Sequence, residues 1–261
     1  MVKSECLLRV FYLQVPINAT TASQGSCFTI ESSENLAQIM RQYVITARHI
    51  FEDVGYPSKH CVSLLISQKL QSFTANIYYH TNPNVDIAVM EIGTYTSPFV
   101  QNQQFSTADI AWGQDVFILG FPSGFVGALP NYPQSNGSTG NKIPMIARSC
   151  LSTMINEGGV SHLCLDGHNN KGFSGGPVCF YHKGVISKQM CIAGVVKGFN
   201  TNQYPVHFGK PNPLTNRFDR VGDLIHDDSD GKQYPCFIEN NSGIFWATDI
   251  RHAHEIIKTI P

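Results

Sequence analysis

The chain has 261 residues and a formal net charge of −1 at pH 7. Charged residues make up 14% of it, well below the ~25% of typical soluble domains. The length allows one large domain or two small lobes around a sizeable core. Near-neutral charge gives no electrostatic reason to expect nucleic acid or an anionic membrane as a partner. No apolar run approaches the roughly 20 residues that are needed to span a bilayer.

Strand-like segments recur along the whole chain. They are short, rich in Val, Ile, Phe and Tyr, and separated by turn sequences such as NPN and NGSTGN. The expected strands lie near residues 6–15, 25–31, 41–47, 61–67, 73–80, 86–92, 115–120, 144–154, 162–166, 176–181, 189–198 and 243–248. The stretch 34–42 fits a helical turn or a hairpin arm equally well. The stretch near 98–112 has fewer strand-forming residues, and we expect the chain to cross there between two all-β lobes.

The end of the chain changes to helical spacing. Its apolar residues are Ile250, Ala253, Ile256, Ile257 and Ile260, which share one face of a helix. Thr248 or Asp249 is placed to cap the N-terminus of this helix, and Lys258 lies in its last turn. We therefore expect many short strands followed by one terminal helix.

The sequence contains eight cysteines. No CxxC pair and no zinc-finger spacing occurs among them, so no metal or other cofactor is expected. Cys27, Cys179 and Cys191 lie inside apolar runs, where cysteine behaves as a small hydrophobic residue. Free, buried thiols are therefore expected, together with a reducing, cytoplasmic location.

Residues 172–178 read GFSGGPV, a glycine-rich turn around Ser174. A serine hydroxyl becomes a useful nucleophile only beside an imidazole, which in turn needs an acceptor to hold its tautomer. His49 follows a β-rich run ending in TARH, and Asp86 precedes the apolar segment IAV. Each of these residues alone is usually structural. Their type, order and strand-end positions together predict a catalytic constellation.

The segments TARH, DIAV and GFSGGPV resemble the signature segments of chymotrypsin-like (trypsin-like) serine proteases. GSCFTI resembles the strand pair before the histidine, VFILGFPSG the opening of the second barrel, and IAGVVKGF the strand after the serine. The resemblance implies an all-β fold of two packed six-stranded antiparallel β-barrels with a C-terminal helix. The barrels would occupy residues 1–105 and 106–248, and the helix residues 249–261.

The resemblance also implies a role for each residue in a serine endopeptidase. Ser174 would attack the scissile carbonyl, His49 would act as general base and then general acid, and Asp86 would orient His49. The N–H groups of Gly172 and Ser174 would form the oxyanion hole. The partners expected are a protein or peptide substrate and a regulatory protein, with no nucleic acid and no membrane.

Two departures separate the chain from secreted members of this family. Phe173 stands where zymogens carry an aspartate that pairs with a newly cut N-terminus, so activation by N-terminal cleavage is not expected. Ile50 stands where those enzymes carry a bridging cysteine. The pattern is closest to bacterial intracellular or quality-control trypsin-like peptidases, here as a protease domain without an appended peptide-binding domain.

Substrate specificity is assigned to two segments by the same resemblance. The segment 166–171 would form one wall and the base of the primary pocket, and Lys197, Gly198 and Phe199 the opposite edge. No acidic residue is evident at the pocket base, and His168 with Lys197 would favour a small or acidic side chain. The long stretch 200–242 either covers the cleft, docks a partner or is without a role.

The sequence leaves two alternatives to a serine protease. Residues 172–176 satisfy the GxSxG pattern of α/β-hydrolases, but that fold requires a helix after the serine and the order Ser, acid, His. The second alternative is a catalytically silent pseudoprotease, in which the same two barrels act as a binding or scaffolding module.

Overall fold

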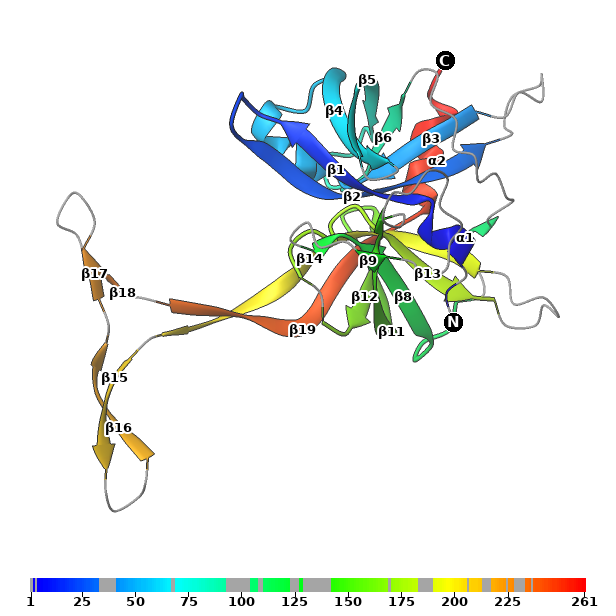
Figure 1. Ribbon diagram of the computed structural model, residues 1–261. Helices are drawn as coiled ribbons and strands as arrows, with labels where there is room; N and C mark the ends of the chain where they lie inside the picture. Colours follow the sequence, from blue (N-terminus) through cyan, green and yellow to red (C-terminus); the bar gives the residue numbers. More distant parts are fainter. Residues whose placement is uncertain are drawn as a thin grey trace. The chain divides into compact units, whose positions relative to one another are not determined.

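A computed structural model gives the fold of the chain (Figure 1). The described residues are 2, 4–32, 41–66, 69–92, 104–107, 110–122, 127–128, 142–168, 170–182, 190–205, 207–212, 217–223, 225–227, 233–235 and 237–261. The chain divides into two compact units. The main unit comprises Met1–Gly198 and Gly243–Pro261, and the insert comprises Phe199–Ser242.

The first half of the main unit is a closed six-stranded barrel with strand order β1-β2-β3-β6-β5-β4. All of its strand pairs are antiparallel. The strands are β1 (Val10–Pro16), β2 (Ala22–Ser32), β3 (Arg41–Thr46), β4 (Lys59–Ile66), β5 (Lys69–Tyr79) and β6 (Ala88–Glu91).

The second barrel runs in the order β13-β8-β11-β12-β19-β14 and closes through a β13–β14 pairing. Its strands are β8 (Asp115–Gly120), β11 (Met145–Glu157), β12 (Val160–Asp166), β13 (Pro177–Tyr181), β14 (Met190–Pro205) and β19 (Phe237–Asp249). The short β7 (Gln104–Phe105) adds to β14 in parallel, and β9 (Gly127–Ala128) pairs with β10 (Lys142–Ile143). The predicted all-β fold of two six-stranded barrels with a terminal helix is thus confirmed.

The insert forms two antiparallel strand pairs within the long 200–242 segment. They are β15 (His207–Asn212) with β16 (Arg217–Asp223), and β17 (Ile225–Asp227) with β18 (Gln233–Pro235). The segment therefore carries regular secondary structure, although no strand was predicted there.

Alternating burial explains why these sequences form barrels. In β1, Leu13 and Val15 are fully buried while their neighbours are partly exposed, the period of a strand with one face on a core. One apolar cluster fills the first barrel and includes Ile50 and Phe51 of the 3₁₀ helix η1 (Arg48–Val54). A second cluster joins both barrels and the terminal helix.

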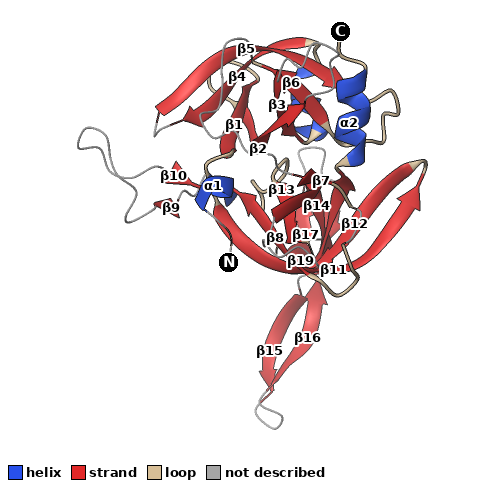
Figure 2. Cartoon of the chain, turned by 90° about the vertical axis from the view of Figure 1, so that its right-hand side faces the viewer, coloured by secondary structure: helices blue, strands red, loops and turns tan. Residues whose placement is uncertain are grey.

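The two α-helices that the structure describes lie near the chain ends. Helix α2 (Arg251–Lys258) follows the second barrel but packs on the first, as Figure 2 shows. Its N-cap residue is Ile250, which makes no side-chain cap. Asp249, one residue earlier, accepts the Arg251 N–H at 2.9 Å. This predicted capping residue therefore bonds a backbone N–H of the first turn, although it does not occupy the N-cap position. At the other end, α1 (Ser4–Leu7) replaces the start of the strand predicted from residue 6.

The seven described cysteines form no disulfide bond with one another; five are buried as expected, but Cys61 is exposed and Cys150 is partly exposed. Burial raises the pKa of Cys27 and Cys179 far above the ordinary range, which makes these thiols unreactive at neutral pH. Cys236 lies outside the described residues. Within the described part of the chain, no helix has the length and apolar character to cross a membrane.

Candidate functional site

His49 and Asp86 meet where two strands of the first barrel end or begin. β3 ends at Thr46 and His49 lies in the first turn of η1, while Asp86 lies two residues before β6. The His49 Nδ1 atom lies 2.8 Å from Asp86 Oδ2, and the His49 backbone N–H donates to Asp86 Oδ1 at 2.8 Å. Because an ionised carboxylate only accepts hydrogen bonds, Nδ1 carries the proton and Nε2 keeps a free lone pair.

The charge of Asp86 sets the basicity of His49. Burial of the ring opposes the charged imidazolium, but the hydrogen bond to Asp86 and its negative charge outweigh burial, with a smaller contribution from Glu52. The pKa of His49 therefore lies above its ordinary value of 6.5. Asp86 itself is only 7% exposed, so its carboxylate is held in place rather than solvated.

Arg48, the residue before His49, supports the His49–Asp86 pair through its own contacts. Its guanidinium lies 4.7 Å from the centre of the Tyr56 ring and 5.4 Å from that of Tyr79. Its Nη1 donates to the carbonyl of Pro83 at 3.3 Å, three residues before Asp86. The cation–π contacts and this hydrogen bond tie η1 to the loop that carries Asp86.

Ser174 lies in the loop before β13, and this loop packs against the segment that leads to His49. A side chain at Gly175 would collide with Ser26 O and Thr46 Oγ1 and approach Ala47 N to 2.9 Å. The Ser174 hydroxyl, however, donates to the carbonyl of Lys197 at 3.2 Å. Among the described residues no hydrogen bond joins Ser174 to His49. The structure thus pairs His49 with Asp86 and packs the serine loop against Thr46 and Ala47, just before His49, while the Ser174 hydroxyl is turned to Lys197.

The glycines of this loop are required by its backbone. Gly172 and Gly175 have φ angles of 105° and 83°, which residues with a Cβ atom resist. Gly175 also donates its N–H to the carbonyl of Val196 at 2.8 Å. The glycines of the GFSGG sequence are therefore explained by a tight turn.

Phe173 anchors the same turn by burial. Its side chain is 3% exposed, and a Cβ atom added at Gly120 would lie 2.7 Å from Phe173 Cδ1. The Phe173 carbonyl accepts the N–H of Gly176 at 2.8 Å. An apolar side chain packed at the end of β8 therefore holds the position at which zymogens carry an aspartate.

We expect Phe173→Ala to destabilise the fold by about 3–5 kcal/mol, the usual effect of removing a buried aromatic ring. Denaturant unfolding measures the loss. The matched control is Phe180→Ala in β13, which removes another fully buried ring. Both variants should lose similar stability, but only Phe173→Ala should speed the amide hydrogen exchange of Gly175 and Gly176, whose N–H groups are hydrogen-bonded in this turn. Equal exchange rates at these two groups in the two variants would contradict an anchoring role for Phe173.

A cavity of about 840 Å³ opens beside His49 and Asp86. The second barrel contributes Glu157, His162 and Lys197 to its lining. Burial and the charge of Lys197 lower the pKa of His162, so this ring is neutral at pH 7. Sequence reasoning missed the lining residues of the β11–β12 hairpin, because their approach to His49 arises only when the barrels pack.

The predicted specificity residues are only partly gathered at this site. Lys197 and Gly198 line the cavity, and Lys197 accepts the Ser174 hydroxyl through its carbonyl. His168 is exposed in the loop after β12, and the side chain of Phe199 lies outside the described part. Ser26 was not predicted to have a role, although it lies within the GSCFTI segment.

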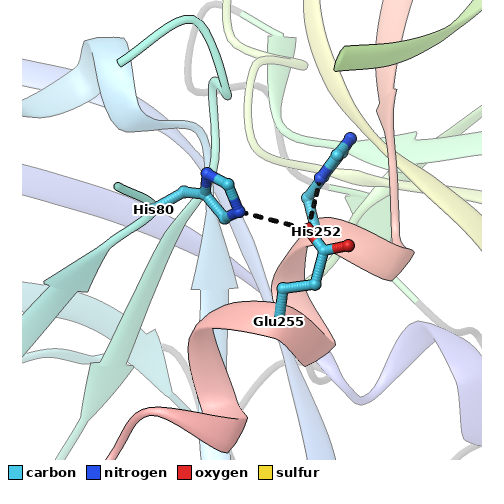
Figure 3. Close-up of side chains that lie close together, drawn as sticks. All are labelled: His80, His252 and Glu255. Carbon is cyan, nitrogen blue, oxygen red and sulfur yellow. Dashed lines mark hydrogen bonds and ion pairs between the residues drawn. The ribbon is translucent and has the colours of Figure 1, made fainter. Parts of the chain in front are cut away.

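His80, His252 and Glu255 form the one described side-chain group with the spacing of metal ligands (Figure 3). His80 Nε2 lies 3.1 Å and His252 Nδ1 2.7 Å from the same Glu255 oxygen. The outer ring nitrogens accept backbone N–H groups from Asn82 and Ser161. Each inner nitrogen must therefore carry the proton and donate it to Glu255. A metal ion would need the opposite tautomer. The group is therefore better explained as hydrogen bonds that join the residue after β5 to α2.

Comparison with known proteins agrees with this architecture. The family model described as "Trypsin-like peptidase domain" matches residues 25–186. No curated protein matches the sequence significantly. The solved structure of the HtrA-type protease AlgW with a tripeptide aligns over 98% of this chain at a TM-score of 0.55 and 16% identity. An inactive form of Rv3671c from M. tuberculosis aligns over 98% of this chain and 90% of its own, at a TM-score of 0.52 and 16% identity.

These structural matches share the fold, and their low identities carry no assignment of chemistry. The chain spans 61% of the length of the AlgW chain. The family match, over residues 25–186, includes the segments that carry His49, Asp86 and Ser174.

Proposed function

Because the chain belongs to the family of trypsin-like peptidase domains, we propose that it is a serine endopeptidase that hydrolyses peptide bonds through Ser174, His49 and Asp86. The observation that carries the proposal is the double hydrogen bond between Asp86 and His49. This bond leaves the Nε2 lone pair of His49 free to take a proton.

In the proposed reaction the Ser174 hydroxyl rotates from the Lys197 carbonyl toward His49. Nε2 accepts the hydroxyl proton as Oγ attacks the scissile carbonyl, and Asp86 stabilises the imidazolium that results. The N–H groups of Gly172 and Ser174 receive the oxyanion. His49 then protonates the leaving amine, and water hydrolyses the acyl-enzyme by the same steps.

The cavity beside His49 supplies the space for substrate residues in this proposal. Its lining carries both charge signs, with Glu157 and Lys197 among its residues. Lys197, Gly198, His168 and Phe199 remain proposed substrate contacts. Exposed Lys197 favours an acidic substrate side chain near Ser174.

One observation favours the second candidate, a non-catalytic binding module. The Ser174 hydroxyl bonds to a backbone carbonyl and not to His49. In the endopeptidase, by contrast, the hydrogen bond between Ser174 and His49 would form only in the substrate complex, as is common for catalytic groups.

Labelling with a fluorophosphonate distinguishes the two candidates. A serine hydrolase should be labelled at one residue, Ser174, and labelling should disappear in Ser174→Ala and after denaturation. The control Ser152→Ala, at an exposed serine of β11, should label as the parent protein does. Absence of labelling in the parent protein would refute the endopeptidase and support the binding module.

The pH dependence of labelling follows from the pKa of His49. Only the neutral imidazole can accept the serine proton, and Asp86 keeps the ring protonated to higher pH. The labelling rate should therefore fall on acidification, with a midpoint above 6.5. Glu52→Gln removes a charge that raises this pKa, so it should move the midpoint to lower pH. A midpoint that does not respond to Glu52 would indicate that another group titrates.

A further inference from the structure

Ser26 of β2 connects the first barrel to the serine loop of the second. Its hydroxyl donates to the carbonyl of Gly172 at 2.7 Å and accepts the N–H of Phe121 at 2.9 Å. Its own N–H donates to the carbonyl of Ser174 at 2.8 Å. One residue thus contacts the loop at both positions whose N–H groups form the proposed oxyanion hole.

The surroundings of Ser26 fix its position. The residue is completely buried, and its carbonyl accepts the Thr46 hydroxyl at 2.8 Å. A Cβ atom at Gly120 would lie 2.8 Å from Ser26 Oγ, so the hydroxyl has little room to rotate. Because its oxygen already accepts from Phe121, its proton is directed to Gly172.

We propose that Ser26 is a positioning residue that holds the Gly172–Ser174 turn in the form that binds an oxyanion. This inference rests on the proposed function. With its carbonyl held by Ser26, the peptide that follows Gly172 cannot rotate freely. Ser26 also holds the Ser174 carbonyl, so the peptide that carries the Ser174 N–H lies between two held carbonyls, and the peptide that carries the Gly172 N–H adjoins the first of them.

In this chain neutral contacts hold the turn, in place of the ion pair between an aspartate and a newly cut N-terminus. Phe173 has no charge with which to hold the turn, but its ring is buried and Ser26 bonds the residues on both sides of it. A hydroxyl–carbonyl hydrogen bond does not titrate near neutral pH. These contacts therefore hold the turn without an N-terminal amine released by cleavage. They also do not depend on the ionisation of His49.

The test is the rate of fluorophosphonate labelling in Ser26→Ala, separated into the maximal rate (kinact) and the half-saturating concentration (KI). We expect kinact to fall about 10- to 100-fold, because a misplaced oxyanion donor should cost less than the complete loss of one. KI and the pH midpoint should stay unchanged, because His49 and the cavity are untouched. A general loosening of the fold would change KI and the midpoint as well, and this outcome would overturn the proposal.

Ser63→Ala is the matched control, since it removes another buried serine hydroxyl of the first barrel, bonded to Ser72 at 2.9 Å. Its kinact should equal that of the parent protein, and an equal fall in both variants would refute a specific role for Ser26. If Ser26→Ala does not fold, Ser26→Cys retains a weak donor of similar size and should still lower kinact. A folded Ser26→Cys with parental kinact would overturn the inference.

These outcomes are separate from the fate of the proposed function. If the parent protein is not labelled at Ser174, the endopeptidase proposal fails. If it is labelled at Ser174 and Ser26→Ala reacts equally fast, the endopeptidase proposal stands and the role of Ser26 fails.

Discussion

Ser174→Ala is expected to lower the rate of peptide hydrolysis by about 10⁶-fold. Alanine has no group that could form the acyl-enzyme, so only stabilisation of the oxyanion by the loop N–H groups would remain. Turnover of a fluorogenic peptide, chosen from the sites cleaved in a denatured protein mixture, measures the loss.

The same substitution tests whether Ser174 and His49 act together. Residues that share one step are not additive, so His49→Ala alone and the double variant should lose about as much activity as Ser174→Ala. Ser152→Ala should retain parental activity. Further loss in the double variant would show that the two residues serve separate steps.

Asp86→Asn is expected to lower turnover by about 10⁴-fold while leaving the fold intact. The asparagine side chain has nearly the same shape, but it removes the negative charge that raises the pKa of His49. It also no longer enforces the tautomer with the proton on Nδ1. The midpoint of the pH–rate profile should therefore move to lower pH as turnover falls.

Asp115→Asn is the control for this substitution. Asp115 bonds the exposed Arg148 at 2.7 Å on the surface of β8, and exposed ion pairs contribute little to stability. This variant should retain parental turnover and an unchanged pH midpoint. Parental turnover in Asp86→Asn would contradict the proposed role of the Asp86–His49 pair.

The local sequence was sufficient to place His49, Asp86 and Ser174 at strand ends. Alternation of apolar residues identifies a strand wherever one face is buried, and the glycines of GFSGG identify the turn because its φ angles exclude other residues. It was not sufficient at α1, where a short helical turn occupies the start of an expected strand. Nor did it predict the strand pairs of the insert.

The sequence by itself determined the all-β fold, the helix at its end and the residue types that a hydrolase needs, because these depend on short-range periodicity and turn chemistry. Only the tertiary structure decided what surrounds them. Ser26 contacts Gly172, and His162 lines the cavity beside His49, because the two barrels pack against each other. Contacts between residues more than a hundred positions apart depend on how closed sheets fit together, and no local pattern encodes that fit.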